Sequence, residues 1–413
     1  MFIAILGRQP KIGTAEIEAV YGANAVTELA DDILEVETDF LDISHLGGTK
    51  KAGLVFARTP RDQNAILSAI LKHLTELNVD GKTTLGLSAY HLPFTAANLQ
   101  KIGMRLKVEL KKQGKSLRLV PNSEPALSTA TSHHNKLGLS PNKIEIFLIG
   151  QKGKVVLATS TGAQNITAYA ARDQKRPKRD AFVGMLPPKL AQIIVNLAVQ
   201  QTVSERTKIR VLDPFCGTGV VLQEALLMGH CVYGTDLNPK MIDYSRENLN
   251  WLLAGPVARS APKNFCHTEV DKTFLGAAPP RATRSSSFNL DVGDATKFKW
   301  QKPIGAVASE VYLGQPFSAP PSDAKLAEVR RICRAITVEF LTNLAPQIKS
   351  GTLVCLAVPA WRTKYGFTRL DILDTISKLG YNIQQFKHAT QQDLLYCRDS
   401  QVVGRELLVL KRS

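Results

Sequence analysis

Near the middle of the chain, a strand, a glycine-rich turn, a helix and a second strand follow one another directly. Residues 209–212 form a short apolar, β-branched run that is typical of a buried parallel strand. Apolar residues at helical spacing follow over 220–228, and the next predicted strand, 230–234, leads to Asp236. This order predicts a nucleotide-type crevice, because glycines let the backbone approach a ligand and a carboxylate at the strand end accepts ribose hydroxyls.

The turn itself, Gly217-Thr218-Gly219, narrows the choice of ligand. It is neither the dinucleotide pattern G-x-G-x-x-G nor a phosphate loop, which needs a lysine after its glycines. Asp213 opens the turn instead, and a carboxylate suits a ligand with an ammonium group. S-adenosylmethionine fits these requirements, because it has an amino-acid end, a ribose and an adenine, and no phosphate. The alternative, left open by two glycines alone, is an ordinary Rossmann-like turn with Asp213 as a helix cap.

Length and composition indicate a globular protein of two or three domains, since 413 residues are 44% hydrophobic and 21% charged. The sequence contains no run of eighteen apolar residues and no signal peptide at its start, so we expect a cytoplasmic protein without a membrane segment. Its six cysteines contain no C-x-x-C pair. Buried free thiols are therefore expected, and no metal site is predicted.

Positive charge is concentrated in one part of the chain. Of a net charge of +16, residues 101–190 supply most, because they hold 17 Lys and Arg against 5 Asp and Glu. Such a concentration favours a polyanion partner, and nucleic acid is favoured over an anionic membrane because no basic amphipathic helix with aromatic anchors accompanies it. The alternative for 101–112 is a solvated helix face. The candidate RNA contacts are Lys101, Arg105, Arg118, Arg172, Lys175, Arg176 and Arg179.

Strands and helices alternate along the chain, as an α/β protein requires. In the first part we predict strands over 2–6, 33–36, 84–90 and 116–120, a hairpin of 143–149 and 154–159, and helices over 14–20 (capped by Thr14), 63–77, 94–113 and 127–137. Residues 169–180 are predicted to form an extended basic linker. Later come helices over 191–200, 239–253, 325–348 and 370–379 and strands over 288–292, 304–309, 351–358, 381–388 and 406–411, with a surface loop over 254–287. The second part predicts a mostly parallel sheet with an antiparallel edge hairpin.

Several long motifs occur in an order typical of one family. They are LGGTK (46–50), YAARDQKRPKRD (169–180), GMLPPKLAQIIVNLA (184–198), DPFCGTG (213–219), GTDLNPKMIDYSRENLNWL (234–252) and GDAT (293–296). With them the chain resembles the THUMP-domain tRNA guanosine N2-methyltransferases, the guanosine-10 type, over essentially its whole length. The resemblance implies a ferredoxin-like domain over 1–57, a THUMP RNA-binding domain over 58–160, a basic linker over 161–187 and a Rossmann-like S-adenosylmethionine-dependent methyltransferase domain over 188–413.

The resemblance also implies a set of cofactor contacts. Asp236 would bind the ribose, while Asp294, followed by Ala295, would hold the adenine amine. The methionine end would be lined by Pro188, Lys189, Asp213, Phe215, Gly217 and Gly219. For Asp236 and Asp294 the alternative is a helix cap or a turn.

One motif departs from the family. Amino-methyltransferases usually carry Asp, Asn or Ser followed by Pro-Pro-Tyr or Pro-Pro-Phe after the fourth strand, and this chain has SEVYLG over 309–314. We expect Glu310 to accept a hydrogen bond from the exocyclic amine and Tyr312 to stack on the extruded base. The alternatives are an ion pair between Glu310 and an arginine, and a half-buried packing ring for Tyr312.

The function implied is S-adenosylmethionine-dependent methylation of the N2 amine of a tRNA guanosine, at position 10. Two alternatives stay open because of the altered motif. One is an amino-methyltransferase of DNA or rRNA, which would not need a THUMP module. The other is a tRNA-binding homologue with weakened catalysis. The number of methyl groups, the tRNAs used and a small activating protein partner are open as well.

Overall fold

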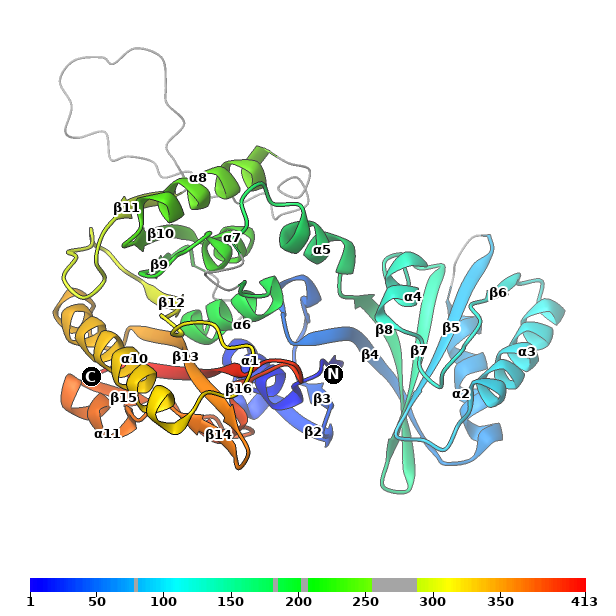
Figure 1. Ribbon diagram of the computed structural model, residues 1–413. Coiled ribbons are helices and arrows are strands. Elements are labelled where there is room, and N and C mark those ends of the chain that lie inside the picture. The colour runs from blue at the N-terminus through cyan, green and yellow to red at the C-terminus, as the bar shows by residue number, and fades with distance from the viewer. Residues whose placement is uncertain (78–80, 181–184, 202–206, 255–287) are drawn as a thin grey trace, which may run out of the picture. The chain divides into compact units, whose positions relative to one another are not determined.

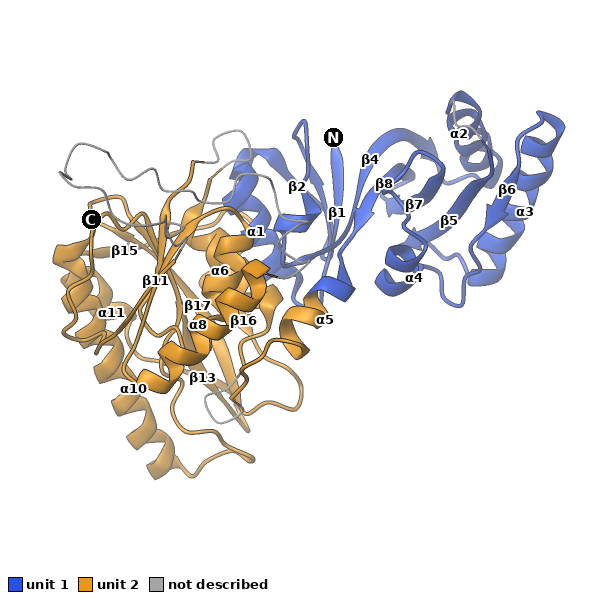
Figure 2. Ribbon diagram, turned by 90° about the horizontal axis from the view of Figure 1, so that it is seen from above, with its two compact units in different colours: residues 1–168 blue, residues 169–413 orange. Residues whose placement is uncertain are grey.

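The computed structural model describes residues 1–77, 81–180, 185–201, 207–254 and 288–413. They form two compact units, residues 1–168 and 169–413 (Figure 2). The loop predicted over 254–287 lies outside the described residues from 255 onward. No helix in the described ranges is both long enough and apolar enough to cross a lipid bilayer.

The first unit is built on one eight-stranded sheet with the order β2-β3-β1-β4-β8-β7-β5-β6 (Figure 1). Its strands are β1 (Phe2–Leu6), β2 (Val26–Ala30), β3 (Ile33–Val36), β4 (Thr49–Pro60), β5 (Thr83–Tyr90), β6 (Leu117–Leu119), β7 (Lys143–Gln151) and β8 (Lys154–Ala163). Its helices are α1 (Pro10–Tyr21), α2 (Gln63–Glu76), α3 (Ala96–Lys112) and α4 (Thr129–His134). The long strand β4 pairs with β1 on one side and β8 on the other, so the predicted border between 57 and 58 falls inside a strand shared by both halves of the sheet.

Several predicted elements of this unit are confirmed. The strands over 2–6 and 33–36 have the predicted bounds, and β7 and β8 form the predicted antiparallel hairpin. The cap at Thr14 is wrong, because α1 begins at Pro10 and Thr14 is buried in its interior, where Oγ1 donates to the Pro10 carbonyl at 3.1 Å. Proline at the first helical position has a φ that suits the helix and no N–H to leave unpaired, so the helix starts one turn earlier than predicted.

The two glycines of the LGGTK motif lie in the loop before β4 and are hydrogen-bonded to α1. The backbone N–H groups of Gly47 and Gly48 donate to the two carboxylate oxygens of Glu16 at 2.8 and 2.7 Å. A Cβ atom on Gly48 would lie 2.6 Å from the Cα of Gly13, which is far inside van der Waals contact. Glycine is therefore required at position 48 by the close approach of the loop to the helix.

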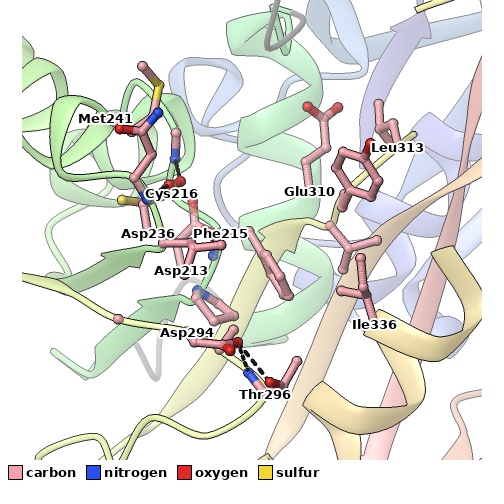
Figure 3. A pocket seen from close by; sticks show the side chains of 18 of the residues that line it. Asp213, Phe215, Cys216, Asp236, Met241, Asp294, Thr296, Glu310, Leu313 and Ile336 are labelled. Carbon is pink, nitrogen blue, oxygen red and sulfur yellow. Dashed lines mark hydrogen bonds between the residues drawn. The ribbon is translucent and has the colours of Figure 1, made fainter. Parts of the chain in front are cut away.

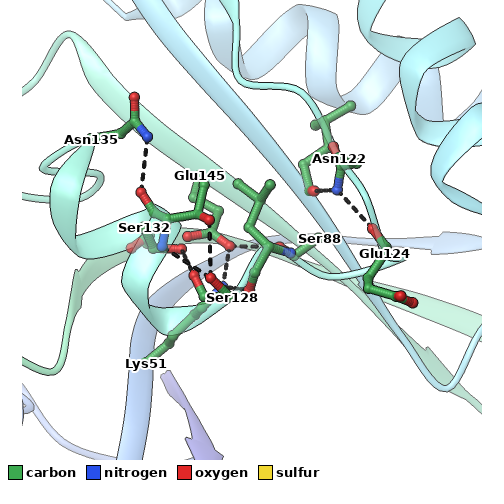
Figure 4. Close-up of polar contacts among 12 residues, drawn as sticks. Lys51, Ser88, Asn122, Glu124, Ser128, Ser132, Asn135 and Glu145 are labelled. Carbon is green, nitrogen blue, oxygen red and sulfur yellow. Dashed lines mark hydrogen bonds and ion pairs between the residues drawn. The ribbon is translucent and has the colours of Figure 1, made fainter. Parts of the chain in front are cut away.

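A buried polar cluster lies between β4, β5 and β7 (Figure 4). The Lys51 ammonium donates to Glu145 Oε1 and to the Leu127 carbonyl, both at 2.6 Å. Ser88 Oγ donates to the same Glu145 oxygen at 2.5 Å and accepts from the Leu127 N–H at 2.9 Å. Burial lowers the pKa of Lys51 despite the neighbouring carboxylate. The cluster holds the chain before α4 against the sheet.

The second unit contains a sheet with the order β11-β10-β9-β12-β13-β17-β15. Its strands are β9 (Arg210–Asp213), β10 (Cys231–Asp236), β11 (Phe288–Val292), β12 (Ala306–Glu310), β13 (Leu353–Thr363), β15 (Tyr381–Ile383) and β17 (Val403–Arg412), with β14 (Gly366–Arg369) on β13 and β16 (Leu395–Tyr396) on β17. The helices from the unit border onward are α5 (Ile166–Gln174), α6 (Pro188–Val199), α7 (Val220–Leu227), α8 (Pro239–Ala254), α10 (Asp323–Leu344) and α11 (Leu373–Ile376).

The pairing in this sheet confirms the predicted Rossmann-like fold. The strands β11, β10, β9, β12 and β13 are joined by parallel pairs, and β17 is antiparallel to both β13 and β15. The predicted antiparallel pair is therefore found at this edge of the sheet, with β17 between β13 and the edge strand β15. The predicted strand over 381–388 and helix over 370–379 are shorter in the structure, whereas β13 continues five residues past the predicted end at 358.

The prediction of an extended linker over 169–180 is wrong for its first half. Helix α5 covers Ile166–Gln174 and turns Tyr169 and Arg172 inward. Arg172 forms two hydrogen bonds with Glu224, from Nε at 2.6 Å and from Nη2 at 3.1 Å. Residues three positions apart share a helix face, and the carboxylate compensates the buried guanidinium. This part of the motif therefore stabilises the second unit.

The cysteines agree in part with the expectation. Cys216, Cys333 and Cys355 are buried free thiols, and Cys397 is a free thiol that is half-buried. Cys231 is disulfide-bonded, so the expectation of a free thiol is wrong at that position.

Candidate active site

A cavity of about 800 Å³ opens at the carboxyl ends of the parallel strands. Asp213, Asp236 and Glu310 are the last residues of β9, β10 and β12, and Asp294 follows β11 by two positions. All four line the cavity. Ligands bind to open parallel sheets at this edge, and the volume lies in the range of small-molecule sites.

Phe215 also lines the cavity, and in the view of Figure 3 its ring lies between two groups of side chains. The side chains of Asp213, Asp236 and Asp294 lie on one side of this ring, and Glu310 and Leu313 lie on the other (Figure 3). The three predicted donor carboxylates thus lie on the first side and the predicted acceptor carboxylate lies on the second. Tyr312 lines the cavity as well.

The glycine turn is held by α8. Gly217 and Gly219 have φ values of 51° and 80°, which L side chains rarely adopt. Ser245 Oγ donates to the Gly217 carbonyl at 2.8 Å. A Cβ atom on Gly219 would lie 2.9 Å from Ser245 Oγ. Asn248 Nδ2 donates to the Thr218 carbonyl at 2.9 Å. These contacts therefore fix the conformation of the turn, which borders the cavity through Gly217 and Thr218.

Asp213 is buried at the base of the cavity. Its Oδ1 accepts from Ser309 Oγ at 2.6 Å and from the Phe215 N–H at 3.3 Å. Burial raises the pKa of Asp213 to about 7, against the lowering effect of these two hydrogen bonds. A carboxyl group with this pKa becomes fully ionised when a cation is brought beside it.

Asp236 and Asp294 are oriented by hydrogen bonds that leave acceptor capacity unused. Asp236 accepts from the Gly217 N–H at Oδ2 and from the Asn238 N–H at Oδ1, both at 2.9 Å, and each oxygen has a second lone pair. Asp294 accepts from the Thr296 N–H and hydroxyl at 2.9 and 2.7 Å, both at Oδ1, so Oδ2 is available to a ligand. These Thr296 bonds lower the pKa of Asp294, whereas burial raises that of Asp236.

On the acceptor side, Glu310 is ion-paired. Its Oε1 accepts a short hydrogen bond from Arg405 Nε on β17, and the Arg405 side chain is 5% exposed against 15% for Glu310. The ion-pair alternative for Glu310 is thus found, and Glu310 lines the cavity as well. Tyr312 is 46% exposed and lines it too, which argues against a packing ring. Ser309 is buried and bonded to Asp213, so Glu310 is the residue of SEVYLG that brings a carboxylate to the cavity.

The remaining predicted cofactor residues divide into two groups. Phe215, Gly217 and Ala295 line the cavity. Pro188 is buried at the start of α6, and the Lys189 ammonium lies 5.2 Å from the centre of the Tyr169 ring. These two and Gly219 are not among the described lining residues, so the structure does not bring them to the cavity.

The predicted RNA contacts also divide. Exposed side chains are found at Lys101, Arg105, Arg118, Lys175 and Arg179. Arg172 is buried against Glu224, and Arg176 is 3% exposed. The prediction that these two guanidinium groups contact phosphates is not supported, because neither reaches the surface of the described structure.

Several lining residues had no signal in the sequence. Helix α10 contributes Ile332, Ile336 and Glu339, and Met241 comes from α8. Leu237 had a local signal, because it directly follows the predicted ribose carboxylate. In the structure it is 72% exposed, which is unusual for leucine.

Comparisons with known proteins agree with this geometry. Residues 176–257, which contain the glycine turn and Asp236, match the RMKL-like methyltransferase domain family. The tRNA (guanine(10)-N2)-dimethyltransferase of Methanothermobacter thermautotrophicus is 46% identical over 189 residues, which is 46% of this chain and 42% of that protein. The tRNA (guanine(6)-N2)-methyltransferase of Thermus thermophilus is 35% identical over 119 residues, 27% of this chain and 33% of that protein. The matched part thus spans less than half the length of either relative.

Among solved structures, TrmN from Thermus thermophilus aligns over 100% of this chain and 99% of its own, with a TM-score of 0.49 and 15% sequence identity. The family match and the two curated relatives confirm the resemblance drawn from the motifs: over its methyltransferase segment, this chain is similar to the tRNA guanine-N2 methyltransferases.

Proposed function

We propose that this protein is an S-adenosylmethionine-dependent tRNA methyltransferase that acts on the exocyclic N2 amine of a guanosine, with position 10 as its target. The observation that carries the proposal is one cavity that contains Asp213, Asp236, Asp294 and Glu310 inside a segment that matches a methyltransferase domain. Position 10 is favoured over position 6 because the guanine-10 relative is more similar and over a longer segment.

The residues on the first side of Phe215 suit S-adenosylmethionine. Asp236 has lone pairs for the two ribose hydroxyls, and Asp294 Oδ2 can accept from the adenine amine. Asp213, with a pKa of about 7, would be ionised by the ammonium group and hold it. When bound there, the cofactor supplies an electrophilic methyl group on a sulfonium centre.

The residues on the second side suit a guanine amine. The lone pair of this amine is delocalised into the ring, so the nitrogen is a poor nucleophile. Glu310 would accept a hydrogen bond from one N–H of the amine. This contact would hold the amine with the nitrogen lone pair directed toward the methyl group of the cofactor. Arg405 fixes the carboxylate in place, and Tyr312 would stack on the base. The surplus proton then passes from the methylated nitrogen to Glu310 or to solvent.

The partner we propose is tRNA, which the protein would meet in the cytoplasm. The net charge of +16 supports a polyanionic substrate, and Lys101, Arg105, Arg118, Lys175 and Arg179 are exposed for phosphate contacts. The THUMP assignment of residues 58–160 remains part of this proposal.

The test is mass spectrometry of nucleosides after incubation of unmodified tRNA with the protein and methyl-labelled S-adenosylmethionine. We expect labelled N2-methylguanosine or N2,N2-dimethylguanosine that disappears when guanosine 10 is replaced by adenosine. Label retained in that transcript and lost when guanosine 6 is replaced would move the target to position 6. Label in DNA or rRNA and none in tRNA would contradict the proposal.

A further inference from the structure

A β-hairpin rises from the sheet beside the acceptor side of the cavity. Ala357 of β13 lies opposite Glu310 of β12, and β13 continues for six more residues to Thr363 before β14 returns from Gly366. Six strand residues correspond to roughly 20 Å of extended chain. Because β12 and β13 are parallel, this extension continues past the carboxyl end of β12, where Glu310 lines the cavity. Figure 1 shows the hairpin of β13 and β14.

The tip of the hairpin carries a tyrosine that the fold does not use for packing. Tyr365 is 87% exposed, the highest value among the large hydrophobic side chains of the described residues. The Lys364 ammonium lies 4.8 Å from the centre of its ring. Residues 360–370 contain three basic side chains and no acidic one. An exposed ring beside a cation is a combination that suits a nucleobase next to a phosphate.

The rest of the hairpin is held firmly, so the ring is presented on a rigid support. Arg362 donates from Nε to the Gln401 carbonyl and from Nη2 to the Arg398 carbonyl, both at 3.2 Å. Arg369 forms an ion pair of 2.6 Å with Glu406. Glu406 directly follows Arg405, which holds Glu310, so the support of the hairpin and that of the acceptor carboxylate are continuous along β17.

We propose that Tyr365 stacks on an unpaired base of the RNA substrate outside the cavity, with Lys364 at the adjoining phosphate. The inference rests on the proposed function for the identity of the strand. A nucleic acid is favoured over a protein partner because the tip offers a single ring among cations and not a contiguous apolar patch. Stacking here would hold the strand so that the target base can leave the helix and enter the cavity.

The first experiment compares tRNA binding and turnover of Tyr365→Ala, Tyr365→Phe and the unchanged protein. Because stacking uses the ring and not the hydroxyl, we expect the Kd for tRNA to rise about tenfold in Tyr365→Ala and to stay within twofold in Tyr365→Phe. The kcat at saturating tRNA and the Kd for S-adenosylmethionine should stay within twofold in both. Leu373→Ala, at an exposed leucine of α11, is the matched control and should change nothing.

A second readout reports the contact directly. A tryptophan introduced as Tyr365→Trp should lose fluorescence when tRNA is added, and one introduced as Leu373→Trp should not. An unchanged Kd in Tyr365→Ala, an equal loss in Tyr365→Phe, or an unquenched Tyr365→Trp would overturn the inference. Quenching without any methylated guanosine would refute the proposed function and keep the Tyr365 contact. Methylated guanosine without quenching would keep the proposed function and refute the Tyr365 contact.

Discussion

Two of the buried ion pairs in the described residues look alike and differ in their surroundings. Lys51 and Glu145 meet inside the first unit, where their side chains are 3% and 0% exposed. Arg405 and Glu310 meet in the second unit, with side chains that are 5% and 15% exposed. Glu145 also accepts from Ser88, in a closed cluster, whereas Glu310 borders a cavity of about 800 Å³.

The two pairs differ in what else their side chains contact. The Lys51 ammonium donates to a backbone carbonyl as well as to Glu145, so the first pair joins two strands to the loop before α4. In the second pair the arginine is more deeply buried than the glutamate, and Glu310 faces the cavity. The closed pair ties segments of the fold together, and the pair at the cavity fixes the orientation of the carboxylate that lines it.

The largest effect is expected from breaking the first pair. Lys51→Met leaves the Glu145 carboxylate buried without its cation, and we expect the free energy of unfolding of the first unit to fall by about 3–5 kcal/mol. Chemical denaturation followed by a probe in that unit measures this. The double variant Lys51→Met/Glu145→Leu should recover much of the loss, and a double variant as unstable as the single one would contradict the assignment.

Breaking the second pair should slow methyl transfer and leave S-adenosylmethionine binding unchanged. Glu310→Gln removes the charge that we propose holds the amine, and we expect kcat to fall by about a hundredfold. The Kd for S-adenosylmethionine should stay within twofold, because Glu310 lies across Phe215 from the donor carboxylates. Single-turnover kinetics and calorimetry on the same sample separate the two. If both quantities changed equally, Glu310 would belong to the donor side.

A smaller effect is expected on the donor side itself. Asp236→Asn replaces a charged acceptor for the ribose hydroxyls, and the Kd for S-adenosylmethionine should rise roughly 10- to 100-fold. Asp291→Asn is the control, because Asp291 accepts from the Tyr233 hydroxyl at 2.6 Å and is not among the lining residues. Calorimetry that gave the same Kd for both variants would remove Asp236 from the ribose site.

The smallest effect is a dependence on pH. The pKa of Asp213 is raised to about 7 in the free protein, and a cationic ligand favours the carboxylate and so lowers this pKa in the complex. Binding therefore releases a proton below pH 7, and affinity should rise by up to about tenfold from pH 6 to pH 8 and then level off. The same titration on Asp213→Asn should be flat. A slope that persists in this variant would assign the dependence to another group.

The sequence predicted the donor half of the site because that half is local. The glycine turn, Asp236 and GDAT each lie at the end of a strand whose apolar run marks it, and parallel strands bring such ends together. The strands over 2–6 and 33–36 were predicted for the same reason, since short β-branched runs with clear ends need no distant partner to be recognised.

The parts that could not be predicted depend on distant partners. Arg172 meets Glu224 at a separation of 52 positions, and Arg405 meets Glu310 at a separation of 95. A basic segment therefore suggested an exposed linker where the structure has a partly buried helix. The lining from α10 is similar, because Ile332 and Ile336 have the spacing of any helix core face.

The central claim is that S-adenosylmethionine occupies the cavity between the donor carboxylates and Glu310. Ultraviolet cross-linking of methyl-labelled S-adenosylmethionine, followed by peptide mapping, tests it most directly. We predict label within residues 213–241 or 293–297 and its loss in the presence of excess S-adenosylhomocysteine. Competable label confined to the first unit, with none in these peptides, would contradict the account.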